Sequence, residues 1–108
     1  AEVDRLFHAL ADATRRDIVG RVLNDEQSIT DLARHYPMSM TAVQKHVAVL
    51  EGAGLVTKHR HGREQRVRGV VQAIRTAQVL LDAYEQVWRD RFDRIGDLLA
   101  EPTEEGTT

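Results

Sequence analysis

The chain has 108 residues, of which 42% are hydrophobic and 30% are charged, and it contains no cysteine. This size and composition are typical of one soluble globular domain, and the lack of cysteine excludes disulfides and thiolate metal sites. No apolar run approaches the roughly 18 residues that a membrane helix needs, and the start AEVDRLFHAL does not have the form of a secretion signal. We therefore expect a cytoplasmic protein without a membrane partner.

The net charge of −2 hides an uneven distribution of charge along the chain. Residues 31–68 hold seven lysines and arginines, three acids and four of the five histidines, whereas the segments 1–30 and 69–108 are acidic. A basic segment between acidic flanks is compatible with a nucleic-acid partner, but chance clustering on a solvated surface gives the same counts. The position of these residues within a motif therefore has to show whether they bind nucleic acid.

Apolar residues at helical spacing predict two helices at the start of the chain. The first covers residues 2–11, and the second covers ATRRDIVGRVL at 13–23. Asp12 is the expected cap of the second helix. A polar turn at 24–27 follows.

A short third helix and a longer fourth helix come next, with a tight connection between them. Thr30 is the expected cap of the third helix, DLARHY at 31–36, which Pro37 ends. Ser39 is the expected cap of the fourth, whose apolar residues recur every three to four positions until Gly54 ends it. Two helices joined so closely are typical of a helix-turn-helix.

The next segment, 55–69, reads as a β-hairpin, because LVT and QRV flank a turn at His61-Gly62. A long helix from Val70 to Leu99 follows, with nearly a heptad seam over about three heptads. The predicted fold class is therefore mainly α with a small β-hairpin, in the order α-α-α-α-β-β-α of a winged helix-turn-helix.

We assign residues 1–100 to a single DNA-binding and dimerisation domain. The remainder, EPTEEGTT at 101–108, is expected to be an acidic disordered tail.

The polar side chains near the start of the fourth helix are not explained by core packing. Thr41, Gln44 and Lys45 share a face with Ala48, away from the apolar stripe. At this point of a recognition helix, Gln can bond to adenine, Lys to guanine or phosphate, and the Thr methyl can touch thymine. Ser39 and the free amides of the helix start are suited to a phosphate.

The hairpin adds basic side chains for contact with the DNA backbone or the minor groove. The candidates are Lys58, His59, Arg60, His61, Arg63 and Arg66. The competing interpretation is a solvated helix face beside a charged hairpin, but the order of turn, basic segment and hairpin favours DNA. His59 and His61 are two residues apart on a strand, yet two ligands alone do not make a zinc site, so we expect no metal and no cofactor.

The bulky apolar residues of the last helix predict a dimer. Fully burying one such side chain is worth roughly 1.5–3 kcal/mol, and a large exposed apolar patch is uncommon on a soluble monomer. The two-fold interface is expected to contain Val3, Leu6, Phe7, Leu10, Leu81, Tyr84, Trp88, Phe92, Ile95, Leu98 and Leu99. The alternative is a last helix that folds back over its own core.

Over roughly residues 3–100 the sequence resembles the ArsR-type winged-helix transcriptional regulators. The resemblance is carried by ALADATRR, by DLA in the third helix, by KHVAVLEGAGLV in the recognition helix and by HGR in the wing. The C-terminal YEQVWRDRFDRIGDLLAE looks like one subgroup of the family. The resemblance implies a homodimeric repressor whose first and last helices form the interface and whose two recognition helices, about 34–36 Å apart, read an inverted repeat.

Position by position, the resemblance implies DNA contacts at Ser39, Thr41, Gln44, Lys45, His61 and Arg63. His46 matches a histidine that is usual in the family's recognition helix, and we favour a role in packing or hydrogen bonding at the helix-turn-helix junction. Metal-sensing members carry a Cys-x-Cys-like motif around the third helix, or Asp/His and His/Glu pairs on the last helix. This chain has neither.

Two other functions stay open at this point. One is a winged helix that binds a protein, with its basic hairpin against an acidic partner, and the other is a repressor gated by an unidentified small-molecule or metal effector. We expect no enzyme and no catalytic residues, because the sequence has no Gly-rich phosphate loop and no nucleophile–base pair at motif spacing.

Overall fold

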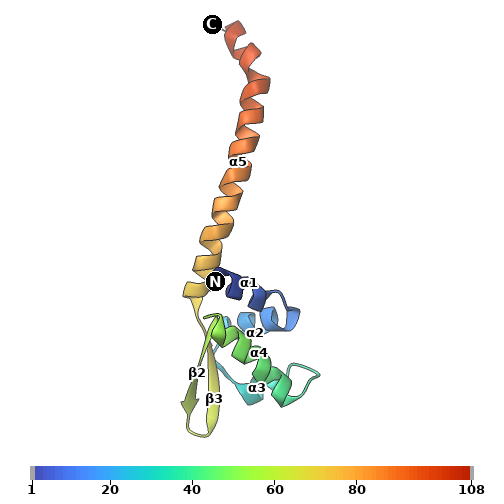
Figure 1. Ribbon diagram of the computed structural model, residues 1–108, viewed down its shortest axis with the longest axis vertical. Coiled ribbons are helices and arrows are strands. Elements are labelled where there is room, and N and C mark those ends of the chain that lie inside the picture. The colour runs from blue at the N-terminus through green and yellow to red at the C-terminus, as the bar shows by residue number, and fades with distance from the viewer. Residues whose placement is uncertain (1, 108) are drawn as a thin grey trace. The chain divides into compact units, whose positions relative to one another are not determined.

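The computed structural model describes residues 2–107, and the side chains of residues 2–99. In chain order the elements are α1 (Glu2–Leu10), α2 (Ala13–Asn24), β1 (Gln27–Ser28), α3 (Ile29–Ala33), α4 (Met40–Gly52), β2 (Val56–His61), β3 (Glu64–Gly69) and α5 (Val71–Thr107) (Figure 1). This order confirms the predicted winged helix-turn-helix, mainly α with a small β-hairpin. The chain divides into two compact units, Ala1–Ala77 and Gln78–Thr108, and the assignment of 1–100 to one domain stays a prediction.

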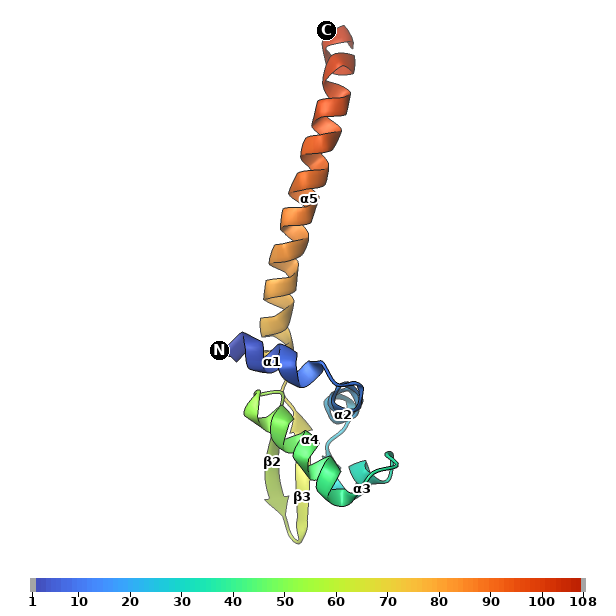
Figure 2. The same ribbon diagram turned by 45° about the vertical axis from the view of Figure 1, so that its right-hand side comes forward.

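The first two helices lie where the sequence predicts them, to within one residue at their ends. Asp12 caps α2 as expected, because its Oδ1 accepts a hydrogen bond of 3.0 Å from the amide of Arg15. This bond satisfies one of the amides that the start of a helix leaves without a partner. In the first unit α1 packs against α2 and α4 (Figure 2).

The third helix begins earlier and is shorter than predicted. The prediction of Thr30 as cap of a helix at 31–36 was wrong, because α3 spans Ile29–Ala33 and Ser28 caps it. The hydroxyl oxygen of Ser28 accepts a hydrogen bond of 3.1 Å from the amide of Asp31. Tight turns follow α3, with amides bonded to carbonyls three residues earlier.

The sheet contains a strand that the sequence analysis placed in a polar turn. Gln27 and Ser28 form β1 and pair antiparallel with Val67 and Arg66 of β3, so the strand order is β1-β3-β2. The prediction of a turn through residue 27 was wrong because the partner of this strand lies about 40 residues away in the sequence, where local patterns do not report it.

Both ends of α4 are confirmed. The hydroxyl oxygen of Ser39 accepts a hydrogen bond of 3.1 Å from the amide of Ala42. At the other end Gly54 has φ +78°, a conformation that favours glycine, and the amide of Leu55 donates to the carbonyl of Leu50 at 3.0 Å. This last bond is the outer hydrogen bond of a Schellman motif, which turns the chain sharply into β2.

The predicted hairpin is confirmed as well. β2 and β3 pair antiparallel, with His61 opposite Glu64. The loop between them consists of Gly62 and Arg63. Of these two residues only Gly62 has a positive φ, which is 65°. A glycine with positive φ at the first loop position is the pattern of a type II′ turn, whose twist matches that of the strands.

The core of the first unit is apolar and draws on its helices and on the sheet. Its fully buried members include Leu6, Ile18, Leu32, Val43, Val47, Leu50, Leu55, Val56 and Val67. The start of α5 adds the buried Ala77. Leu6, which we expected at the dimer interface, lies in this core with only 2% of its surface exposed. Its side chain is therefore buried within its own chain and is not available to a dimer interface.

In the second unit the large apolar side chains of α5 lie open. Tyr84 is 64% exposed and Trp88 is 56% exposed, and the rings of Trp88 and Phe92 meet edge-on with centroids 5.1 Å apart. The helical backbone continues to Thr107, farther than the end at Leu99 that the sequence predicted. The predicted disordered tail falls outside the residues whose side chains are described.

Candidate nucleic-acid interface

The predicted reading face of α4 is exposed. Thr41, Gln44 and Lys45 all face solvent, and the exposed Ala48 follows them on the same face of the helix. The opposite face of α4 is anchored by Val43, Val47 and Leu50, none of which has any exposed surface. The helix is therefore held from one side while its polar side chains project from the other.

The start of α4 offers open amides. The first hydrogen bond within the helix runs from the amide of Val43 to the carbonyl of Ser39, at 3.1 Å. The amides of Met40 and Thr41 precede this bond, as the first amides of any helix do. Together with the helix dipole they form a region that favours an anion such as a phosphate.

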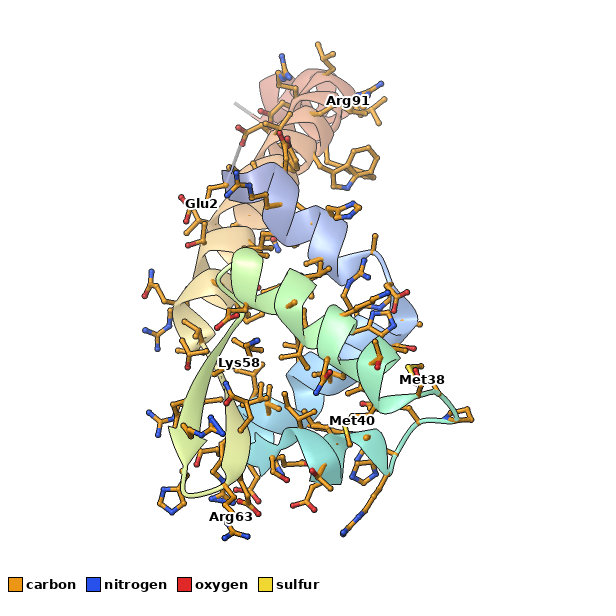
Figure 3. The ribbon with its side chains drawn as sticks, turned by 60° about the horizontal axis from the view of Figure 1, so that its bottom comes forward. Glu2, Met38, Met40, Lys58, Arg63 and Arg91 are labelled. Atoms are coloured by element: carbon orange, nitrogen blue, oxygen red, sulfur yellow. The ribbon has the colours of Figure 1, made fainter. Side chains whose placement is uncertain are left out.

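A hollow of about 510 Å³ lies between α4 and the hairpin. It is lined by Ile29, Thr30, Met40, Gln44, Lys58, Arg63, Glu64 and Gln65. Figure 3 shows Met40 at the start of α4, and Lys58 and Arg63 on the hairpin. The hollow therefore brings Gln44 of the recognition helix and cations of the wing to one concave surface.

The tip of the wing carries free cations. Arg60, His61 and Arg63 are exposed at the end of the hairpin. Within the described residues, none of these three and no atom of Lys45 takes part in an ion pair. The charges of Arg60, Arg63 and Lys45 are therefore available to a polyanion.

Other basic residues of the hairpin are held by carboxylates of the chain. Oε1 of Glu26 lies 3.0 Å from Nε2 of His59 and 3.2 Å from Nη2 of Arg68. Nε of Arg66 lies 3.8 Å from Glu26 and 3.7 Å from Glu64. The sequence suggested Arg66 and His59 as DNA ligands, but the structure places them in a cluster around Glu26 on the outer face of the hairpin.

Lys58 has an acidic neighbour as well. Its Nζ lies 3.4 Å from Oε1 of Glu51, at the end of α4. The pair links β2 to α4 on the side of the hairpin that faces the hollow, so Lys58 is only partly free for a further anion.

A hydrogen-bonded group connects the segment before α4 to α2. The hydroxyl of Tyr36 donates to Oδ2 of Asp17 at 2.6 Å, and Nε of Arg21 donates to the same oxygen at 2.8 Å. Burial, and then the hydrogen bond to Asp17, raise the pKa of Tyr36 to about 12. The same hydrogen bond is the main cause that lowers the pKa of Asp17. The sequence analysis did not find this group.

His46 lies on the side of α4, half-buried, where its Nδ1 is 3.4 Å from Nη1 of Arg15 in α2. This agrees with a structural role, although the contact is made with α2 and not with the turn between α3 and α4. Sequence reasoning also missed Met40, Thr30 and Gln65 as lining residues of the hollow. The signal for Met40 was present, because it is the first residue after the cap of the recognition helix.

Two kinds of site are absent from the described part of the chain. There, no three side chains of the metal-binding types His, Asp or Glu gather closely enough to hold an ion. No described helix combines the length and apolarity required to cross a bilayer.

Residues 10–59 match the model of a family described as a helix-turn-helix domain. Among curated proteins, the HTH-type transcriptional regulator Rv2034 of Mycobacterium tuberculosis is 47% identical over 53 residues, which are 49% of this chain and 50% of that protein. This chain thus spans half the length of that relative. The transcriptional repressor SdpR of Bacillus subtilis is 28% identical over 61 residues, covering 56% of this chain and 68% of SdpR.

Solved structures are similar over more of the chain. An ArsR-like transcriptional regulator from Rhodococcus sp. RHA1 has a TM-score of 0.77 and 31% identity, over 90% of this chain and 92% of that one. The homodimeric winged helix-turn-helix DNA-binding domain of Mb0332 from Mycobacterium bovis has a TM-score of 0.65 and 28% identity, over 78% of this chain and 80% of that one.

Proposed function

We propose that this chain, which belongs to the ArsR-like family of winged helix-turn-helix transcriptional regulators, is a repressor. In this proposal it binds a palindromic DNA operator as a homodimer. The observation that carries the proposal is the exposed polar face of α4 beside free cations of the wing. Thr41, Gln44 and Lys45 project from a helix whose opposite face is fully buried. Arg60 and Arg63 have no acidic partner in the described part of the chain.

In the proposed complex α4 enters the major groove. Gln44 has the amide pair that suits adenine, and Lys45 suits guanine or a phosphate. Ser39 and the open amides at the start of α4 hold a phosphate of the backbone. Arg60, His61 and Arg63 reach the backbone or the minor groove beyond it.

Two of the basic side chains suggested by the sequence have lesser roles in this proposal. Lys58 shares its charge with Glu51, and Arg66 lies between Glu26 and Glu64. Releasing either side chain to bind a phosphate would leave a carboxylate unpaired, so we assign the main phosphate contacts of the wing to Arg60 and Arg63.

The exposed apolar stripe of α5 supports the homodimer. Leu81, Tyr84, Trp88, Phe92, Ile95, Leu98 and Leu99 are each between 49% and 77% exposed. A second copy would cover this stripe with its own α5 and with Val3, Phe7 and Leu10 of its α1. The similar domain of Mb0332 is described as homodimeric. A two-fold axis would then place two copies of α4 about one DNA turn, roughly 34–36 Å, apart.

The binding claim is tested by selecting duplexes from a random-sequence pool with the full chain. We expect the selected duplexes to share an inverted repeat and to bind about a thousandfold more tightly than random duplex at physiological salt. A failure to bind any duplex at low salt would contradict the proposal and would favour the protein-binding alternative.

The dimer is tested by sedimentation of the full chain and of Trp88→Glu, with Arg89→Glu as the matched control. We expect a dimer for the parent and for Arg89→Glu, and a monomer for Trp88→Glu, because only Trp88 lies in the apolar stripe. A monomeric parent protein that still selects an inverted repeat would contradict the proposed homodimer. Because the proposed ligand is DNA, we also propose that the protein acts in the cytoplasm.

A further inference from the structure

The guanidinium of Arg15 joins the last turn of α1 to the recognition helix. Its Nε donates a hydrogen bond of 2.7 Å to the carbonyl of Ala9, and its Nη2 donates one of 3.1 Å to the carbonyl of His8. Its remaining nitrogen, Nη1, lies 3.4 Å from Nδ1 of His46 in α4. One side chain of α2 thus contacts both of the helices that pack against it.

The bonds to α1 have a simple physical reason. The last carbonyls of a helix have no partner within the helix, and a cation at that end also interacts well with the helix dipole. Arg16 acts in the same way, because its Nη1 donates to the carbonyl of Leu10 at 2.8 Å. The contact described for Arg16 stays on α1, however, whereas Arg15 continues to α4.

The contact with α4 constrains the chemistry of His46. An arginine side chain can donate hydrogen bonds but cannot accept them. Nδ1 of His46 can accept a hydrogen bond from this nitrogen only in the tautomer that carries its proton on Nε2. A hydrogen bond between the two side chains thus requires one tautomer and one orientation of the ring.

The position of His46 on α4 determines what this contact can control. Successive residues of a helix are about 100° apart, so His46 lies roughly 200° around the helix from Gln44. Val43 and Val47 pack without directional bonds, so a rotation of the helix about its axis breaks no hydrogen bond at either side chain. A hydrogen bond at His46 is directional, so it resists such a rotation and fixes where Gln44 and Lys45 point.

We propose that Arg15 is a positioning residue for DNA recognition, which locks the rotation of α4 to the last turn of α1 through His46. This inference rests on the proposed function, since it concerns how the reading face is aimed. Its consequence is that the seating of α1, a helix of the proposed dimer interface, sets the aim of the recognition helix. Sequence readout then depends on a residue that does not touch DNA.

The test compares the parent and five variants of the chain on two duplexes. One duplex is the tightest that the parent protein selects from a random pool, and the other has random sequence and equal length. We expect Arg15→Met to weaken binding to the selected duplex by about tenfold, the loss that corresponds to one hydrogen bond of a charged group. Binding to random duplex should stay unchanged. Arg16→Met removes a bond to α1 but no bond to α4, so it should bind both duplexes with the affinity of the parent.

Substitution of His46 separates an effect on the position of α4 from an effect on the stability of the fold. It leaves the hydrogen bonds of Arg15 to the carbonyls of α1 in place, so it also serves if Arg15→Met fails to fold. Asn places an acceptor oxygen near the position of Nδ1, so His46→Asn should keep the discrimination between the two duplexes. His46→Leu should lose it by the same factor as Arg15→Met. The double variant Arg15→Met/His46→Leu should lose no more discrimination between the duplexes than either single variant, because both substitutions remove the same contact.

A spectroscopic measurement completes the test. Long-range proton–nitrogen NMR spectra of the parent protein should show His46 with an unprotonated Nδ1 and a protonated Nε2. Equal discrimination by the parent, Arg15→Met and Arg16→Met, or a proton on Nδ1 of His46, would overturn the inference and leave the proposed function intact. A parent protein that does not discriminate between the duplexes would overturn both.

Discussion

The hydroxyl of Tyr36 donates a hydrogen bond of 2.6 Å to Oδ2 of Asp17, and this bond joins the turn before the recognition helix to α2. Arg21 donates to the same oxygen at 2.8 Å, and its guanidinium carbon lies 5.9 Å from the centroid of the Tyr36 ring. The turn between α3 and α4 is thus anchored by a phenol, a carboxylate and a guanidinium. The anchor fixes where α4 begins.

Substitution Tyr36→Phe removes the hydroxyl and keeps the ring. We expect it to lower the free energy of unfolding by about 1 kcal/mol, a typical value for one hydrogen bond at a partly exposed site. Urea denaturation measures this loss. In an Asp17→Asn background the same substitution should cost less, because the charged acceptor is already gone. An equal loss in both backgrounds would contradict the pairing.

The raised pKa of Tyr36 predicts how stability changes with pH. The pKa is about 12 in the folded chain, against a usual value of 10.0, so folding favours the neutral phenol. Its contribution to stability is therefore complete below pH 10 and is lost as pH rises from 10 to 12. Urea denaturation across this window should show a steeper decline for the parent than for Tyr36→Phe. Equal slopes would show that Tyr36 titrates alike in both states.

The helix starts that the sequence predicted correctly are the ones with local causes. Asp12 and Ser39 each cap a helix through an amide three residues ahead, and both signals lie within a few residues of each other. The start of α3 was not predictable in this way, since Ser28 and Thr30 are both acceptable caps. The choice is made by the pairing of Ser28 with Arg66, which is a tertiary contact.

The candidate interface shows the same division between local and tertiary information. The helical period alone predicted that Gln44 and Lys45 would share an exposed face. Periodicity gave no information about which cations have partners, because Glu26 reaches His59 and Arg66 only after the sheet has formed. The sequence therefore predicted where positive charge gathers but not which charges are free.

Two glycines near the end of α4 should respond in opposite ways to alanine. Gly54 has φ +78°, so Gly54→Ala should lower the free energy of unfolding by about 1–2 kcal/mol. Gly52 is the last residue of the helix, and a Cβ there would meet no atom within 4 Å. Gly52→Ala should therefore raise stability, by about 0.5 kcal/mol. Thermal or urea denaturation measures both, and shifts of the same sign would contradict the assigned conformations.

Arg63 and Arg66 should differ in their contribution to DNA binding. The affinity for random duplex is measured over a series of salt concentrations for Arg63→Gln and Arg66→Gln. Each lost phosphate contact should reduce the slope of log affinity against log salt by about 1. We expect this reduction for Arg63→Gln and little change for Arg66→Gln, because Arg66 lies beside Glu26 and Glu64. Equal reductions would place Arg66 on DNA.

The central claim is that the exposed face of α4 reads base sequence, and substitution of both Gln44 and Lys45 by alanine tests it most directly. The measurement is the ratio of affinities for the selected duplex and for random duplex. Gln86→Ala serves as control, since Gln86 is bonded to Asp90 on α5. We predict that the control keeps the ratio of the parent and that the double variant binds both duplexes equally and weakly. A double variant that still prefers the selected duplex as strongly as the parent would contradict the account.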